Sequence, residues 1–366
     1  MKKIGLLTFH RAINYGAVLQ SYALQHYLSA FVDCEIINYH SEKIELDNGY
    51  PKNLFIYWLK LCYLSVFRRK VLLETLKKRS LFKSFSKKFL RISKNKYNKN
   101  NIFKCNDYYD GFVVGSDQVW NCSLTNNDYV YFLDFAKNKI KVSYAASIGG
   151  FSPGLSFKKY FDDFSFVSLR ETSAVQKVRD TGFNGDVYVV CDPVFLLSKD
   201  EWISNLNLCD NNLDDYILFY EVAPGSFSKS FALDLSKKKG IKIKYVNLYG
   251  TAENCPIGFE NAGFVGPLEF LSLLLKAKYV VTTSFHALAF SIIFNIKCYY
   301  ELNKSGDNNN SRLENLSGIF GLHEFEIKEP TFAKDKDIDF YKINKVLQAY
   351  RNESIDFIEK ALFFGK

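Results

Sequence analysis

Apolar runs and amphipathic stretches alternate along most of this chain. Residues 3–9 and 34–39 are apolar runs of strand length, and residues 17–29 place apolar side chains at a helical period. Such alternation predicts parallel sheets covered by helices, here an α/β fold of two Rossmann-like halves that face each other across a cleft. The other predicted strands cover 112–114, 141–149, 164–171, 186–194, 215–222, 241–249, 279–281 and 296–301, and the other predicted helices cover 227–239, 267–276, 287–294, a short segment from Ser311, and 342–364.

The most informative stretch is residues 278–295, KYVVTTSFHALAFSIIFN. Its apolar start predicts a strand, Thr283 and Ser284 suit a helix cap, and the residues that follow predict a buried helix. A strand that leads directly into a helix leaves the first N–H groups of the helix unpaired, and these groups attract anions. His286 stands in the first turn, where it can donate a hydrogen bond or a proton. From local sequence alone, an ordinary capped helix with a satisfied histidine remains an open alternative.

Polar residues also follow the predicted strands of the first half. Asp117, Ser147, Arg170 and Asp192 each stand at or just after the end of such a strand. Because ligands bind at the carboxyl ends of the strands in open α/β sheets, these four side chains are expected on one rim. Any one of them is more often a turn or cap residue, whereas four on successive strands predict a site.

The connection between the first strand and the first helix reads HRAINYGA. Asn14 and Gly16 stand where such a crossing bends around a ligand. The connection lacks the G-x-G-x-x-G pattern, so dinucleotide binding is not supported.

The length of 366 residues suits two domains of about 150 residues each. We place the first domain at residues 1–197, with a basic helical insertion at about 52–104. A connector rich in Asn and Asp covers 198–214, and the second domain covers 215–340. Residues 341–366 predict a helix that returns to the first domain.

Positive charge is concentrated in the insertion. The whole chain has a formal net charge of +9, whereas residues 52–104 contain 16 Lys or Arg and one acidic residue, Glu74. Residues 54–67 are apolar and aromatic, residues 68–90 continue as a cationic helical pattern, and KNKYNKNN at 94–101 reads as a linker. This pattern favours a segment lying on an anionic membrane surface. A helix packed on its own domain with a solvated basic face remains open, and no DNA- or RNA-reading motif supports a nucleic-acid partner.

Cysteine usage and the N-terminus predict a cytoplasmic protein, either free or on the cytoplasmic face of the membrane. The eight cysteines form no C-x-x-C pair and lie partly in strand-like runs, which indicates buried free thiols in a reducing compartment. The apolar part of MKKIGLLTFHR is too short for a signal peptide, and no uncharged apolar run is long enough to span a bilayer. No set of residues has the spacing of a metal site.

With these residues placed, the chain resembles the polysaccharide pyruvyl transferase family over roughly residues 4–325. No single motif is specific, but their order and spacing together are. The resemblance implies two GT-B-like domains and an enzyme that transfers the enolpyruvyl unit of phosphoenolpyruvate onto two hydroxyls of a sugar, commonly O4 and O6 of a hexose. The motifs are NYGAVLQSYALQHYL from Asn14, GSDQVWN from Gly115, YAASIG from Tyr144, SLRE from Ser168, DPVFLL from Asp192, TSFHALAFSIIF from Thr283 and SRLENL from Ser311.

The resemblance also implies roles for individual residues. The donor carries a phosphate and a carboxylate, so we expect a cationic pocket shared by both halves. The catalytic candidates are His286, Asp117 and Arg170, with His286 toward the phosphate and Asp117 toward the sugar. The donor-binding candidates are Arg170 of the first domain and Thr283, Ser284, His286 and Arg312 of the second. The acceptor-binding candidates, all in the first domain, are Asn14, Tyr15, Gly16, Ser116, Asp117 and Gln118. Phosphoenolpyruvate is the donor substrate, and neither a metal ion nor a further cofactor is expected.

One position departs from the family pattern. Several members carry arginine two residues before the motif histidine, and here that residue is Ser284. Serine still caps a helix, but it brings no charge. Either Arg170 and Arg312 hold the anion alone, or the donor differs in this branch.

The acceptor we expect is a hexose, with galactose first, in a surface polysaccharide precursor or on a lipid carrier. Two alternatives remain open. A GT-B glycosyltransferase using a nucleotide sugar fits the same fold, although no convincing acidic residue for a ribose follows the helix at 287–294. A non-catalytic sugar-binding protein on the membrane surface is the other.

Overall fold

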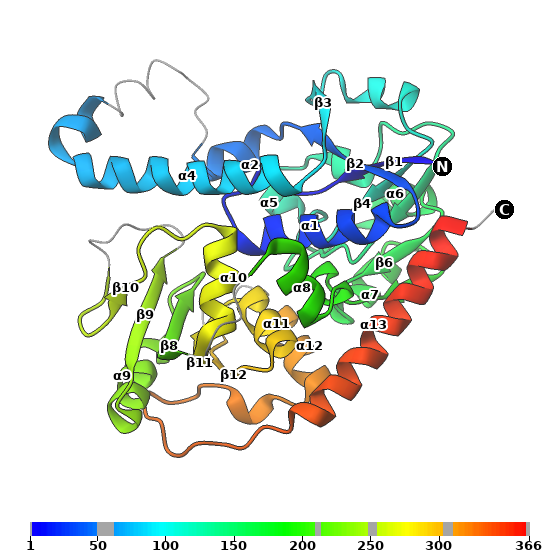
Figure 1. Ribbon diagram of the computed structural model, residues 1–366. Coiled ribbons are helices and arrows are strands. Elements are labelled where there is room, and N and C mark those ends of the chain that lie inside the picture. Colours follow the sequence, from blue (N-terminus) through cyan, green and yellow to red (C-terminus); the bar gives the residue numbers. More distant parts are fainter. Residues whose placement is uncertain (1, 50–61, 209–213, 248–254, 303–309, 364–366) are drawn as a thin grey trace.

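Two parallel sheets form the framework of the protein, as the computed structural model shows (Figure 1). The structure describes residues 2–49, 62–208, 214–247, 255–302 and 310–363. The first sheet has the strand order β3-β2-β1-β4-β5 and the second has β10-β9-β8-β11-β12, with every pair parallel. Both orders place the first strand of the half in the middle, so the predicted pair of Rossmann-like halves is confirmed.

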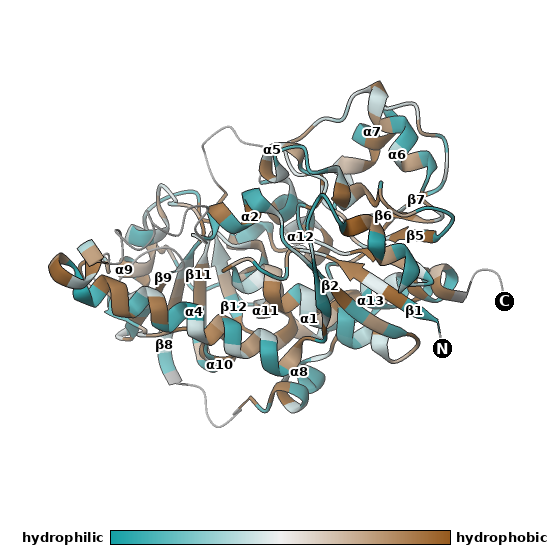
Figure 2. Ribbon diagram, turned by 90° about the horizontal axis from the view of Figure 1, so that it is seen from above, coloured by the Kyte–Doolittle hydropathy of each residue, from teal (hydrophilic) through white to brown (hydrophobic). Residues whose placement is uncertain are grey.

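The first half contains the following elements: β1 (Lys3–Leu7), α1 (Tyr15–Ser29), β2 (Asp33–Tyr39), α2 (Glu42–Asp47), α4 (Arg69–Phe89), β3 (Ile92–Tyr97), β4 (Gly111–Val114), α5 (Cys122–Thr125), β5 (Ile140–Ser143), α6 (Lys158–Asp162), β6 (Val167–Leu169), α7 (Ser173–Arg179) and β7 (Val187–Val189). The short strands β6 and β7 pair with each other and continue the sheet beyond β5 through isolated bridges. They lie together with α6 and α7 at one end of the molecule (Figure 2).

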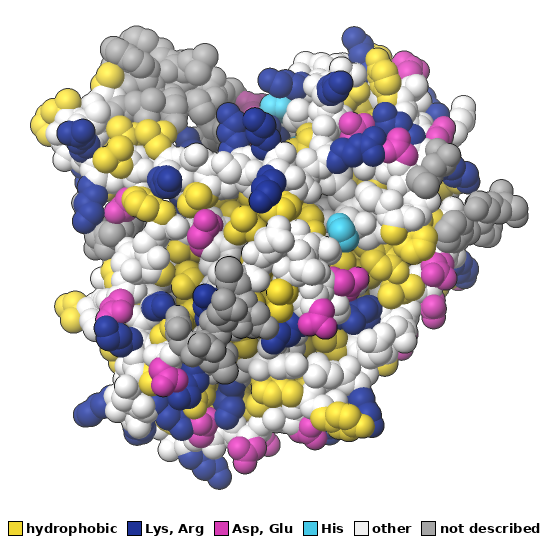
Figure 3. All heavy atoms as spheres, in the orientation of Figure 1, with side chains coloured by type: hydrophobic (Ala, Val, Ile, Leu, Met, Phe, Trp, Pro, Cys, Tyr) yellow, Lys and Arg dark blue, Asp and Glu magenta, His cyan; other side chains and the backbone are white. Residues whose placement is uncertain are grey.

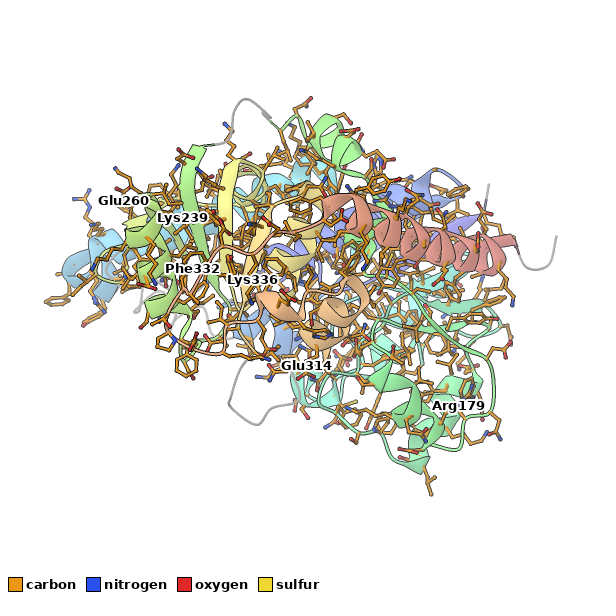
Figure 4. The ribbon with its side chains drawn as sticks, turned by 90° about the horizontal axis from the view of Figure 1, so that it is seen from below. Arg179, Lys239, Glu260, Glu314, Phe332 and Lys336 are labelled. Carbon is orange, nitrogen blue, oxygen red and sulfur yellow. The ribbon has the colours of Figure 1, made fainter. Side chains whose placement is uncertain are left out.

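The second half follows the helix α8 (Lys199–Leu206) and contains β8 (Asp214–Glu221), α9 (Ser228–Lys239), β9 (Lys242–Asn247), β10 (Glu260–Asn261), α10 (Pro267–Lys276), β11 (Ala277–Thr282), α11 (Phe285–Phe294), β12 (Lys297–Tyr300) and α12 (Ser311–Phe320). The segment after α12 is held to this half by Asp335, which pairs with Lys239 and Lys297 at 2.7 Å each. Lys239 also lies 5.7 Å from the ring centroid of Phe332 (Figure 4).

Two segments correct the sequence-based expectations. The first half of the predicted linker at 94–101 belongs to strand β3, an edge strand whose buried positions are Ser93 and Tyr97. The lysines and asparagines of this segment made it look like a linker in the sequence. Charged residues, lysine above all, are nevertheless typical of edge strands, because they discourage pairing with another chain. The predicted connector at 198–214 contains α8, which begins with a Ser198–Glu201 capping box and buries Trp202.

The final helix α13 (Phe340–Phe363) runs back along the first half (Figure 1). Ser354 on this helix accepts a 2.8 Å hydrogen bond from the backbone N–H of Cys191. The ring of Phe357 lies 5.1 Å from that of Tyr188 and 6.3 Å from that of Tyr144. The helix therefore packs on the strands that end in the candidate site.

One of the two buried hydrophobic clusters spans both halves, whereas the other lies within the first half. Residues of the first sheet, such as Leu6, and of the second, such as Val280, belong to the same buried cluster. Tyr15 lies at this junction: its ring stacks on Phe270 of the second half at 4.3 Å, and its hydroxyl donates to the carbonyl of Val265 at 3.0 Å. The halves are therefore packed against each other and are not separate bodies joined by a linker.

The basic helix α4 packs along only part of its length. Phe82 and Phe85 are its buried residues, and Phe82 stacks on Tyr15 at 5.3 Å. Toward its start, hydrophobic side chains lie exposed beside lysines and arginines (Figure 3): Val66 and Phe67, in the helical residues 62–67 that precede α4, are each 72% exposed. In the part of the chain that the structure describes, no helix is both long and apolar enough to cross a membrane.

Candidate active site

The site forms where strands of both halves end. Asp117 follows β4, Arg170 follows β6 and Asp192 lies three residues beyond β7. Asp117 has a positive φ of 73°, a conformation in which asparagine and aspartate are enriched, and its backbone carbonyl accepts from the N–H of Ser147 at 2.9 Å. The second half contributes His286 from the first turn of α11. The rim predicted from the sequence is therefore one region of the molecule.

Asp192 is the centre of the polar cluster. Its Oδ2 accepts from Arg170 Nη1 at 2.8 Å and from the hydroxyl of Ser116 at 3.0 Å, and its Oδ1 accepts from the N–H of Val194 at 3.1 Å. Burial alone would raise the pKa of this carboxyl, but His286 and Arg170 outweigh burial and hold the pKa well below its usual value. Asp192 is therefore a fixed carboxylate.

His286 lies between Asp192 and the first helix of the chain. Its Nε2 is 3.6 Å from Asp192 Oδ2, which is too long for a hydrogen bond. This buried nitrogen therefore has no hydrogen-bond partner among the described residues. On its other side the ring faces Gly16, where an added Cβ would stand 1.9 Å from His286 Nδ1. Glycine at position 16 is thus what allows α1 to approach the histidine.

Arg170 is enclosed and does not line the cavity. It is 2% exposed, its guanidinium carbon lies 4.8 Å from the ring centroid of Phe285, and its Nε lies 3.7 Å from Glu171 Oε2. Glu171 in turn accepts from the hydroxyl of Ser147 at 2.7 Å. Burial acts to lower the pKa of Arg170, but Asp192 and the other carboxylates nearby raise it overall. We predicted that the guanidinium of Arg170 binds the donor directly. The structure corrects this prediction, because the guanidinium is buried and donates to Asp192.

A cavity of about 300 Å³ lies in front of this cluster, at the lower end of the size range of small-molecule sites. Both halves contribute to it. Its polar lining consists of Asn14, Asp47, Asn48, Asp117, Gln118, Thr283, Ser284, His286, Asn310 and Arg312, and Phe9, Ile44, Phe285 and Leu313 are among its apolar lining residues.

Arg312, at the start of α12, is the cation of this lining. Its Nε is buried without a hydrogen-bond partner in the described part of the chain. Burial, followed by the nearby charge of Arg170, lowers its pKa. A buried and incompletely partnered guanidinium is a strong candidate for binding an anion.

The expected cationic pocket needs a correction. Around His286 the structure gathers two arginines, Arg170 and Arg312, together with three carboxylates, Asp117, Glu171 and Asp192. Positive charge therefore does not dominate. The carboxylates come from strand ends of the first sheet, and a count of basic motif residues could not reveal that they neutralise the arginines.

The remaining candidates divide into two groups. Asn14 caps α1 by accepting from the N–H of Ala17, Ser284 caps α11 by accepting from the N–H of Ala287, and Thr283 donates to the carbonyl of Ala223. Together with Gln118, these residues line the cavity.

Tyr15 and Ser116 do not line it, so their prediction as acceptor-binding residues is corrected. Tyr15 is buried between the halves, and Ser116 is buried against Asp192. Sequence reasoning also missed Asp47, the last residue of α2, and Asn48, which follows it, because neither stands in a recognisable motif.

No group of three or more His, Cys, Asp or Glu residues in the described ranges has the geometry of a metal site.

Comparison with protein-family models decides the family. The model described as polysaccharide pyruvyl transferase matches residues 14–305, which is most of the chain. This chain belongs to the polysaccharide pyruvyl transferase family. The site described above is therefore the candidate active site of a pyruvyl transferase, an enzyme that uses a pyruvyl donor and a sugar acceptor. Comparison with curated proteins finds no match.

Solved structures with a similar fold are distant in sequence. The UDP-GlcNAc 2-epimerase of Methanocaldococcus jannaschii is 14% identical with a TM-score of 0.49, covering 100% of both chains. The UDP-GlcNAc 2-epimerase of Neisseria meningitidis is 11% identical with a TM-score of 0.47, covering 99% of this chain and 100% of its own. The glycosyltransferase SnogD of Streptomyces nogalater is 10% identical with a TM-score of 0.44, covering 99% of this chain and 98% of its own.

Proposed function

We propose that this pyruvyl transferase takes the enolpyruvyl unit of phosphoenolpyruvate and forms a pyruvate ketal across O4 and O6 of a hexose, with release of phosphate. The observation that carries the proposal is one cavity, shared by both halves, that is lined by His286, Asp117 and Arg312. A ketal transfer needs an acid, a base and an anion-binding group, and these residues supply the three.

The reaction balances with these groups. A proton is added to the methylene carbon of the donor, and the first sugar hydroxyl attacks the resulting oxocarbenium-like carbon while a base removes its proton. The C–O bond to phosphate then breaks, and the second hydroxyl closes the ketal as its proton leaves with the phosphate. His286 is the proton donor on the phosphate side, and Asp117 is the base on the sugar side.

Donor binding falls mainly to Arg312 and to the start of α11, where Thr283 and Ser284 line the cavity. The helix start carries roughly half a positive charge, and Arg312 adds a full one. Arg170 is a positioning residue in this proposal, because it holds Asp192, and Asp192 lies beside His286. An arginine in place of Ser284 is therefore not required for an anion site.

The experiment is an assay of phosphate release and ketal formation with purified protein, phosphoenolpyruvate and a panel of galactosides. His286→Gln and Asp117→Asn should each reduce turnover at least about a hundredfold, roughly 2.7 kcal/mol, with the circular dichroism unchanged. Activity should also survive treatment with EDTA, since we propose no metal ion. Donor binding without any ketal on a broad acceptor panel would overturn the proposal, and so would full activity of both variants.

One feature argues against a nucleotide sugar as donor. In a Rossmann-like half the start of the first helix is the usual phosphate site. Here the carboxylate of Glu301 occupies the start of α9 and accepts from the N–H groups of Ser226, Phe227 and Ser228 at 2.7–3.1 Å. Thermal shift should therefore respond to phosphoenolpyruvate and not to a panel of nucleotide sugars.

We further propose galactose as the hexose, carried in a surface-polysaccharide precursor on a lipid carrier at the cytoplasmic face of the membrane. Support comes from the start of helix α4 and the residues just before it, where Val66 and Phe67 are exposed together with Arg69, Lys70 and Lys77. Apolar side chains can enter the headgroup region, and each adjacent cation adds about 1 kcal/mol against anionic lipid. The enzyme would then meet its acceptor at the surface where the lipid carrier lies.

A further inference from the structure

A second cavity, of about 520 Å³, lies beside the candidate active site. The short helix α2 and the neighbouring α5 form the wall between the two cavities: Ile44, Asp47 and Leu124 line the active-site cavity, whereas Leu46 and Thr125 line the second one. A chain-like substrate bound in one cavity could therefore cross α2 and reach the other.

The cations of the second cavity are already neutralised. Lys43 Nζ pairs with Asp47 at 2.6 Å, and Lys99 Nζ lies 3.7 Å from Asp128. His40 Nδ1 lies 2.9 Å from a carboxylate oxygen of Glu45. With each cation beside a carboxylate, the cavity does not concentrate the positive potential that a phosphate group requires.

The remaining lining suits neutral hydroxyl groups. Asp128 is buried and held in place by the hydroxyls of Tyr39 at 2.9 Å and Ser41 at 3.1 Å. The side-chain amides of Asn100 and Asn126 line the same cavity and make no hydrogen bond within the described residues. An amide both donates and accepts, so these two amides match the alternating hydroxyls of a sugar.

We propose that this second cavity binds a further sugar unit of the acceptor, next to the hexose that receives the ketal. This inference rests on the proposed function, and it assigns the second cavity to the part of the acceptor chain next to the reacting hexose. The subsite would add affinity for a longer acceptor without taking part in the chemistry. It therefore predicts a preference for chain length.

The test fills the cavity from an exposed position. Leu46, 40% exposed, lines the second cavity, so Leu46→Trp should occupy it, and Leu155→Trp, at a 75% exposed position that lines neither cavity, is the matched control. Ketal formation is measured on methyl β-galactoside and on a galactose-terminated tetrasaccharide. In Leu46→Trp, kcat/KM for the tetrasaccharide should fall at least about tenfold, which is 1.4 kcal/mol, while the value for the monosaccharide stays unchanged.

A second variant checks the contact chemistry. Asn126→Gly removes the amide and keeps the left-handed backbone, with φ of 55°, that Asn126 adopts. It should reproduce the selective loss on the tetrasaccharide. Equal losses on both acceptors, or no loss on either in both variants, would overturn the subsite.

Failure of the proposed function has a different signature, because wild-type protein would then form no ketal on either acceptor. In that case saturation-transfer NMR with the tetrasaccharide decides the subsite by itself. Binding to wild type and to Leu155→Trp that is lost in Leu46→Trp supports the subsite, and binding that is equal in all three proteins overturns it.

Discussion

Gly16 of the first half lies directly against the ring of His286, the catalytic candidate from the second half. A methyl group at position 16 would overlap the imidazole, so Gly16→Ala must displace the ring. Alanine favours a helix by up to about 1 kcal/mol over glycine, so the variant should keep or gain helical stability while losing activity. We expect turnover to fall at least about tenfold in the ketal assay.

Gly154→Ala is the matched control for this prediction, because nothing lies within 4 Å of the added methyl group. Its activity should equal that of the wild type. If Gly16→Ala also kept full turnover, the position of His286 would not matter for the reaction.

The two arginines of the site should respond differently to the same substitution. Arg170 is buried and paired with Asp192, so Arg170→Gln leaves a buried carboxylate short of a partner and should lower the free energy of unfolding by about 3–5 kcal/mol. Among the described residues Arg312 has no comparable pair, so Arg312→Gln should leave stability nearly unchanged and raise KM for phosphoenolpyruvate at least about tenfold. Chemical denaturation and steady-state kinetics separate the two effects, and a reversed pattern would exchange the roles.

His10 should make the stability depend on pH. Burial, the largest influence, lowers its pKa from 6.5 to about 4, and Arg11 and His40 act in the same direction against the hydrogen bond to Thr8. Between these pH values the unfolded chain binds a proton that the folded chain does not. Stability should therefore fall as pH falls from 6.5 to 4, by about 1.4 kcal/mol per pH unit from this residue.

Denaturant midpoints at pH 7 and pH 4.5 measure this dependence. The decrease should be smaller in His10→Gln and unchanged in His323→Gln, since His323 is exposed. An equal decrease in all three proteins would assign the pH dependence to other groups.

For single residues, the sequence predicted which of them follow a strand end better than it predicted which side chains contact them. His286, Asp117 and Gln118 follow strand ends, and local pattern was enough to place them at the rim. Tyr15 and Ser116 stand in the same motifs, but their partners Phe270 and Asp192 are distant in sequence and bury them. Local pattern carries no information about such contacts.

At the scale of elements, the exposed start of α4 leads us to predict that the protein binds anionic membranes. Wild-type protein should float with vesicles containing phosphatidylglycerol at low salt and dissociate at high salt, because exposed charges are screened. Replacing both Val66 and Phe67 with serine should weaken flotation at least about tenfold, since burying each side chain contributes about 1.5–3 kcal/mol. Ile257→Ser, at a 97% exposed position in the second half, is the control. Absence of binding to anionic vesicles would end the membrane proposal.

Elements with a strong period were predictable and weakly patterned ones were not. Helices α10 and α11 and the strands β1 and β11 lie close to their expected ranges, because each buries a continuous apolar set. Strand β3 was missed because an edge strand pairs through its backbone on one side only and tolerates lysine and asparagine elsewhere.

For the whole molecule, the shared core predicts cooperative unfolding. Because the buried cluster joins both sheets, neither half should keep its packing after the other unfolds. Trp120 reports from the core of the first half and Trp202 from the junction with α11. Fluorescence of Trp120→Phe and Trp202→Phe variants and far-UV circular dichroism should give one coincident denaturant transition, whereas two separated transitions would mean that the halves unfold independently.

The overall architecture followed from the alternation of strands and helices, but the electrostatic balance of the site did not. Arg170, Glu171 and Asp192 lie in motifs that read as separate strand endings, and their pairing exists only once β6 and β7 lie side by side. The excess positive charge of the chain resides mainly in the insertion. The net charge of the whole chain therefore did not predict the charge balance around the cavity.

Glu301 occupies the start of α9, the place where a Rossmann-like half usually binds a phosphate. Its carboxylate accepts from the N–H groups that would otherwise be free to bind a phosphate at the start of α9. The selectivity of this half against nucleotides would then reside in a single side chain. Shortening that side chain should reopen the helix start to free phosphate, and an enzyme with two competing anion sites should become sensitive to inhibition by its own product.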